Sequence, residues 1–246
     1  MTLTIPQLAL DAGVFLPALL DGYVNFVASH QSELVTRTIE HIQIIVQTIV
    51  IAVPLGVILG TLITFNDRAA TVVIWLAGIM MTIPSIALFG LLIPYLGIGQ
   101  PPVIFALILY SQLPVVRNTY VGLTQIDPAA TEAARGLGMS RIERLRRVQL
   151  PMAVPVIMAG VRNAVVIIIG IAAIGAFIGA GGLGFFIFDG ISYRDVPKIV
   201  VATVVLSALT LLIDYVFSLF ERYFRALNGE EVEFPRFIDS FVGVGG

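Results

Sequence analysis

The side chains best placed to do chemistry lie in one charged segment, residues 127–151, of an otherwise apolar chain. Five arginines and two glutamates stand there, with small residues between them. These residue types suit electrostatic docking to another protein surface rather than catalysis. The positions that carry the pattern are Glu132, Ala133, Ala134, Gly138, Val148, Leu150 and Pro151, with Arg135 and Arg141 beside them.

Two short helices are predicted to position these residues. Asp127 can cap a helix whose first residue is Pro128, because proline has a suitable φ and no amide to lose. Gly138 breaks that helix, and the S-x-x-E pattern at 140–143 is typical of a capping box that starts a second one. The second helix is predicted to end before Pro151. Its apolar and basic residues fall on different faces: Ile142, Leu145 and Val148 on one, and Arg141, Arg144 and Arg147 on another.

The same segment resembles the cytoplasmic coupling loop of ATP-binding-cassette (ABC) importer permeases. That loop reads E-A-A, three residues, G, nine residues and I-x-L-P, and only Val148 departs from it, in place of isoleucine. The resemblance implies that Glu132 through Pro151 dock on a nucleotide-binding subunit and pass on its ATP-driven closure. The alternative is an ordinary basic loop, kept in the cytoplasm by the positive-inside rule.

Composition independently indicates an integral membrane protein. Of the 246 residues, 58% are hydrophobic and 12% are charged, and the mean hydropathy is +0.98. A soluble domain usually carries about 25% charged residues. The chain has no cysteine, which excludes disulfides and thiolate chemistry. We therefore predict an all-α polytopic membrane protein.

Five apolar runs are long enough to cross a bilayer, which takes about 20 residues. They lie at 42–64, 71–96, 102–121, 153–178 and 199–220. The segment 8–28 is also apolar but contains Asp11 and Asp21, so it is either an interfacial helix or a sixth span. Prolines inside the runs, Pro84 among them, can kink their helices. Gly56 and Gly60 form a small-xxx-small pair that allows close helix contact.

The basic residues orient these spans. With segment 127–151 in the cytoplasm, most arginines fall on the inner side and only Arg37, Arg194 and Lys198 on the outer side, as the positive-inside rule requires. The C-terminus is then cytoplasmic. The sequence thus divides into an N-terminal extension, 1–33, a permease domain, 34–222, and an acidic cytoplasmic tail, 223–246.

Motifs for catalysis are missing from the sequence. A phosphate-binding Walker loop needs a glycine-rich turn followed by lysine, but the lone lysine, Lys198, follows Pro197. Two histidines without cysteine make no convincing zinc site. A glycine-rich run follows the fourth span, and no strand precedes it, so it is predicted to be an outer gate or re-entrant loop. Its glycines are Gly179, Gly181, Gly182 and Gly184.

Charged residues inside a membrane are costly unless they are paired. Arg162 in the fourth span and Asp214 in the fifth lie at similar predicted depth, which favours an ion pair between them. In the alternative, Arg162 extends to the lipid headgroups while Asp214 meets a helix end or Arg222. The sequence leaves both possibilities open.

Four further stretches, 83–85, 93–99, 113–120 and 176–184, sharpen the resemblance. Together with the coupling loop, they make residues 34–222 similar to osmoprotectant permeases, which import glycine betaine, choline, carnitine or related solutes. This implies a type I ABC importer permease fold in the cell membrane of a prokaryote. The alternatives are an ABC permease for methionine or an oxyanion, and a secondary transporter that needs no ATPase.

The resemblance also implies partners. These are cytoplasmic ABC ATPase subunits, an external solute-binding protein, a second permease copy in a homodimer, and membrane lipid, with no role for nucleic acid. ATP and Mg²⁺ then belong to the partner ATPase, and we expect no cofactor, metal or catalytic residue in this chain.

Overall fold

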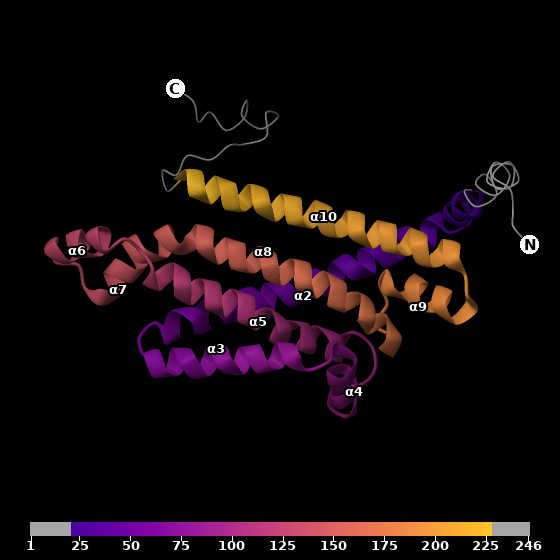
Figure 1. The fold of residues 1–246 in the computed structure, drawn as a ribbon, viewed down its shortest axis with the longest axis horizontal. Helices are drawn as coiled ribbons and strands as arrows, with labels where there is room; N and C mark the ends of the chain where they lie inside the picture. The colour runs from indigo at the N-terminus through magenta and orange to yellow at the C-terminus, as the bar shows by residue number, and fades with distance from the viewer. Residues whose placement is uncertain (1–20, 228–246) are drawn as a thin grey trace, which may run out of the picture.

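A computed structural model describes residues 21–227 of the chain. Within that range the regular structure is helical, without a β-strand. Long helices lie side by side along one axis, with α6 and α7 at one end of the bundle and α4 and α9 towards the other (Figure 1). The predicted all-α polytopic fold is confirmed.

Five long helices build the bundle: α2 (Gln31–Ile63), α3 (Asp67–Thr82), α5 (Gln100–Thr124), α8 (Leu150–Gly175) and α10 (Val196–Leu227). Shorter elements connect them: α4 (Ser85–Leu96), α6 (Pro128–Gly136), α7 (Arg141–Arg144), a π-helical turn (Leu145–Gln149), a 3₁₀ turn (Ala176–Ile178) and α9 (Gly184–Tyr193). Residues 21–29 are also helical. The predicted N-terminal segment 8–28 and the tail 223–246 lie largely outside the described residues, and residues 223–227 continue α10.

The core forms where α5 packs against α2 and α8. Its largest fully buried side chains include Ile44 of α2, Leu107 and Tyr110 of α5, and Ile168 of α8. The α2–α5 contact depends on glycine: a Cβ on Gly56 would lie 2.6 Å from the Val115 side chain, and one on Gly60 would lie 2.5 Å from that of Thr119. The close helix contact predicted from this glycine pair is therefore present.

The second predicted span, 71–96, is wrong as a single helix. α3 and α4 meet at a bend of 98°. Ile83, between them, has extended backbone angles (φ −74°, ψ 127°). Proline disfavours helical angles in the residue before it, so Pro84 ends α3 there. Hydropathy alone does not detect such a bend.

Three single helices of the described range are long and apolar enough to cross a membrane: α2, the continuous helix Arg141–Ile178, and α10. The α3–α4 pair makes a fourth span if it counts as one broken span. α5 corresponds to the remaining predicted span. Its 25 residues reach about 37 Å, enough for the bilayer core, but it carries polar residues and is largely enclosed by its neighbours.

Candidate functional site

The first predicted docking helix, α6, forms as its sequence dictates. The Asp127 carboxylate accepts a hydrogen bond from the Ala129 N–H at 2.9 Å, and Pro128 is the first helical residue. At the other end Gly138 has a left-handed φ of 79°. Its N–H donates to the Arg135 carbonyl, and the next N–H, of Met139, donates to the Ala134 carbonyl. This left-handed cap closes α6 and turns the chain into α7.

The predicted capping box opens α7. The Ser140 hydroxyl accepts from the Glu143 N–H at 3.3 Å, and the Ser140 N–H donates to the Glu143 carboxylate at 3.0 Å. The hydrogen bond from the Ser140 N–H lowers the pKa of the Glu143 carboxyl below its usual range, and the Ser140 hydroxyl makes the second largest contribution. The continuous helix that begins here has 38 residues and spans about 57 Å. Since a bilayer core is about 30 Å thick, its arginine-rich first turns lie outside the membrane.

The prediction that this second helix ends before Pro151 is wrong. α7 passes through the π-helical turn, in which the Leu150 N–H donates to the Leu145 carbonyl, directly into α8. Proline usually breaks a helix because its ring clashes with a carbonyl of the preceding turn. The wider π-helical turn relieves that clash, so Pro151 sits in the first turn of α8. The second docking helix and the fourth span are therefore one continuous helix, Arg141–Ile178.

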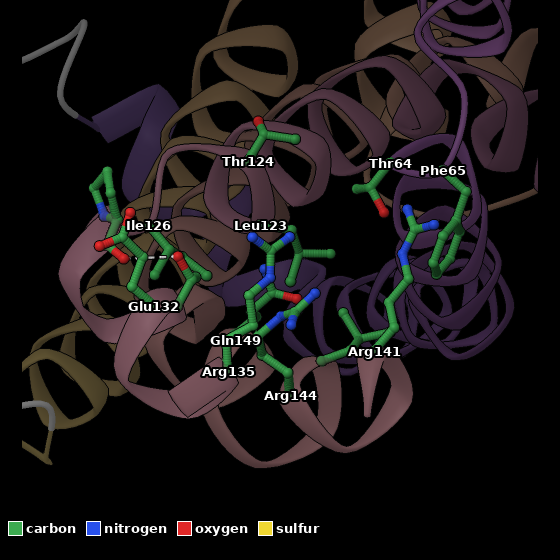
Figure 2. A pocket seen from close by; sticks show the side chains of 13 residues that line it. Thr64, Phe65, Leu123, Thr124, Ile126, Glu132, Arg135, Arg141, Arg144 and Gln149 are labelled. Carbon is green, nitrogen blue, oxygen red and sulfur yellow. Dashed lines mark hydrogen bonds between the residues drawn. The ribbon is translucent and has the colours of Figure 1, made fainter. Parts of the chain in front are cut away.

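These elements enclose an open cavity of about 410 Å³, here named the basic cavity. It lies between α6 and α7 on one side and the α2–α3 turn and the end of α5 on the other. Figure 2 shows Arg135 and Arg144 near its middle, Glu132 at one side and Arg141 beside Phe65 at the other. The Arg141 guanidinium lies 4.3 Å from the centre of the Phe65 ring, a cation–π distance.

The basic cavity holds more positive charge than its own chain balances. Arg135, Arg141 and Arg144 line it with one acid, Glu132. Neither Arg135 nor Arg144 has a hydrogen-bond or ionic partner among residues 21–227. Unpaired guanidinium groups at an open surface bind carboxylates well. The arrangement therefore suits an acidic side chain from another protein.

The other predicted docking residues lie in the same segment, 127–151, but do not line this cavity. Ala133, Gly138 and Pro151 are exposed, Ala134 is buried against the chain, and Val148 and Leu150 are half-buried. Among the described residues, no group of three or more histidine, aspartate or glutamate side chains is placed to hold a metal ion.

The glycine run lies at the opposite end of the bundle, immediately before α9 (Figure 1). Gly179, Gly181 and Gly182 have φ values of 81°, 83° and 75°, a left-handed backbone that other residues rarely adopt. Gly184 instead begins α9 in contact with α8.

Side chains at the start of α2 hold this run, and sequence reasoning missed them. The Glu40 carboxylate accepts hydrogen bonds from the Gly182 N–H and from Arg37, both at 3.0 Å. Arg37 also lies 4.0 Å from the centre of the Phe185 ring. The neighbouring His41 is fully buried, with its Nε2 3.2 Å from the Ile169 carbonyl oxygen. The spacing of three residues favours the ion pair between Arg37 and Glu40, but it does not indicate the contact of Glu40 with Gly182.

The structure brings Arg162 and Asp214 together. The guanidinium donates two hydrogen bonds to the carboxylate, at 2.6 Å and 2.8 Å, in the bidentate geometry that charged pairs favour. Glu221 extends this cluster, 3.5 Å from Arg162 and 2.7 Å from Arg225. The cluster joins α8 to α10. Sequence reasoning missed Glu221, although Glu221 and Arg225 stand at the i, i+4 spacing of a helical ion pair.

We predict that reversing either charge of the Arg162–Asp214 pair reduces the folded protein in the membrane. Arg162→Asp and Asp214→Arg each place two like charges together inside the bilayer, where one unpaired charge costs roughly 2.5–3.5 kcal/mol. Both groups are about one-third exposed, so the lower figure applies. The double swap should restore most of the monodisperse protein extracted in detergent. A double swap as poor as the single variants would show that the pair does not stabilise the α8–α10 contact.

The sequence was also compared with known proteins. The family model described as binding-protein-dependent transport system inner membrane component matches residues 52–226. The choline transport system permease protein OpuBB of Bacillus subtilis (strain 168) is 39% identical over 199 residues, covering 81% of this chain and 92% of the relative. The osmoprotectant import permease protein OsmW of Salmonella typhimurium is 41% identical over 197 residues, covering 78% of this chain and 92% of the relative.

Solved structures share the fold. An inward-facing conformation of the MetNI methionine ABC transporter matches with a TM-score of 0.65 at 25% identity, over 78% of this chain and 95% of that chain. A crystal structure of an amino acid ABC transporter matches with a TM-score of 0.68 over 82% of this chain and 98% of that chain. Because the two sequences are only 21% identical, this match supports the fold alone.

Proposed function

Because this chain belongs to the family of binding-protein-dependent transport system inner membrane components, we propose that it imports compatible solutes such as glycine betaine, choline or carnitine. The chain is a permease subunit of an ABC importer in the inner membrane, and such permeases work with ATPase and binding-protein partners. The observation that carries the solute class is the similarity to choline and osmoprotectant permeases, at about 40% identity over some four-fifths of the chain.

We also propose that residues 127–151 form the contact with the ATPase. Glu132, Ala133 and Gly138 would present α6 to a groove of that subunit, while the buried Ala134 packs α6 against its own chain. The arginines of the basic cavity would take up acidic side chains of the ATPase. ATP and Mg²⁺ would be held by the ATPase. In this proposal residues 34–222 form the transport unit, and this chain has no catalytic residue.

The continuous helix Arg141–Ile178 supports a mechanical route for coupling. One end carries the docking arginines and the other leads into the glycine run at Gly179. A helix moves largely as a unit, so a shift imposed on its cytoplasmic end would reach the outer end. In our proposal two copies of the permease form the pathway, and this movement opens it alternately to each side.

Uptake by cells lacking the gene tests the solute class. Returning the gene should restore uptake of radiolabelled glycine betaine, carnitine or choline when the partner subunits are present. Restored uptake of methionine or an oxyanion instead would replace the proposed solute class while keeping the permease role. Uptake that persists without any ATPase partner would favour a secondary transporter.

A further inference from the structure

A second cavity, of about 470 Å³, lies between α3, α5 and α8, and we name it the intramembrane cavity. Its polar lining comes from Arg117, Asn118 and Asn163, and its apolar lining includes Met81 and Ile167. Arg117 lies seven residues, about 10 Å, before the cytoplasmic end of α5. Asn163 lies near the middle of α8. The cavity is therefore within the depth of the bilayer.

Most of the polar groups of this cavity have no hydrogen-bond partner within the described residues 21–227. Arg117 and Asn163 are exposed, and neither side chain has a hydrogen-bond or ionic partner among residues 21–227. Asn118 donates to the Pro114 carbonyl at 2.8 Å, which leaves its own oxygen free. The adjacent Arg162 differs, because it faces α10 and is paired with two acids. An unpaired arginine at this depth normally faces water or a ligand rather than lipid chains.

The lining has the chemistry of a small zwitterion. A guanidinium binds a carboxylate through two parallel hydrogen bonds. The Met81 and Ile167 side chains offer an apolar surface to a methylated ammonium group, which donates no N–H hydrogen bond. The volume lies within the roughly 300–1,000 Å³ common for small-molecule sites. This match supplies a reason for placing arginine inside a membrane helix.

We propose that the intramembrane cavity is a solute site of the permease, in which Arg117 binds the carboxylate of a methylated ammonium solute during transport. This inference rests on the proposed function, which supplies the solute class. It separates the candidate solutes: glycine betaine and carnitine carry a carboxylate, and choline does not. Arg117 therefore discriminates among solutes that share the quaternary ammonium group.

The test compares uptake of the three radiolabelled solutes by the complete transporter. Arg117→Gln should lower the initial uptake of glycine betaine and carnitine about tenfold, as expected for losing a charge-assisted hydrogen bond, and should change choline uptake less than twofold. Arg117→Lys should restore part of the loss. Arg68→Gln is the matched control, because it removes an exposed arginine that lies outside the cavity. Each variant should be present at wild-type level with its ATPase bound.

Three results would overturn the inference while leaving the proposed function intact. Equal losses for all three solutes would assign Arg117 to a general anion such as a lipid phosphate, or to assembly. Unchanged uptake, or a wild-type transporter that carries choline alone, would show that no carboxylate is bound there. If wild type carries none of the three solutes, the proposed function itself fails, and the inference fails with it.

Discussion

Replacing Gly138 with valine is expected to lower solute uptake at least about tenfold while leaving membrane insertion intact. Gly138 has a φ of 79°, and its left-handed turn joins α6 to α7. Left-handed backbone costs an L-residue about 1–2 kcal/mol, and a β-branched side chain adds to this. A Cβ there would meet no atom within 4 Å, so the effect comes from the backbone rather than from a clash. The turn would open and misplace α6 against the ATPase.

Two matched variants isolate this backbone effect. Gly136 also has open space around a Cβ but lies at the end of α6 without a positive φ, so Gly136→Val should retain most uptake. Gly138→Asn should be milder than Gly138→Val, because asparagine tolerates left-handed angles. Uptake and ATP hydrolysis by the purified complex are the measurements. Normal uptake by Gly138→Val would disprove this role of the turn.

Replacing Gly184 with alanine is expected to destabilise the outer end of the bundle. The added Cβ would lie 1.9 Å from the Ala173 carbonyl oxygen, which is backbone and cannot rotate away. α9 would have to move away from α8. Overpacking of this kind costs roughly 3 kcal/mol, which corresponds to a fall in Tm of about 6–12 °C for a chain of this size.

Gly170→Ala is the control for this experiment. Gly170 lies in α8 with no atom within 4 Å of a Cβ. Alanine gains roughly 0.5–1 kcal/mol over glycine in a helix, so Tm should stay level or rise slightly. Thermal unfolding of the detergent-purified chain gives both values. Equal Tm values for Gly184→Ala and wild type would mean that α9 does not pack as closely as described.

Local signals predicted the docking segment well. The Asp127 cap, the proline at the first helical position, the helix break at Gly138 and the Ser140–Glu143 capping box all depend on residues within a few positions of one another. These patterns have a common physical cause, because the backbone amides at helix ends need hydrogen-bond partners. Both ends of α6 and the start of α7 were therefore predictable from the sequence.

The two wrong helix boundaries both involve proline. Pro84 breaks an apolar run that hydropathy treats as one span, whereas Pro151 fails to break a helix because a π-helical turn precedes it. Whether proline bends or ends a helix depends on how the surrounding turn pairs its carbonyls. Counting the residues of an apolar run does not reveal how these carbonyls are paired.

Contacts between distant residues were predictable only where charge demanded a partner. Arg162 and Asp214 are 52 positions apart, and the cost of lone charges in a membrane made their pairing one of the two possibilities that the sequence left open. Glu40 and Gly182 are 142 positions apart, and that contact uses a backbone N–H that no side-chain pattern reveals. The two cavities likewise arise from helices far apart in the sequence.

Co-purification of an ATPase with the tagged chain tests the coupling proposal most directly. Glu132 is exposed on α6 and in our proposal presents that helix to the groove of the ATPase, so Glu132→Arg reverses the charge and lengthens the side chain at the contact, whereas Gln125→Arg adds a positive charge at an exposed position outside α6 and the basic cavity. Wild type and Gln125→Arg, extracted from native membranes in mild detergent, should retain the ATPase, and Glu132→Arg should lose both the ATPase and uptake. An ATPase that stays bound to Glu132→Arg with normal uptake would contradict the account, as would a wild-type chain that moves solute alone after reconstitution.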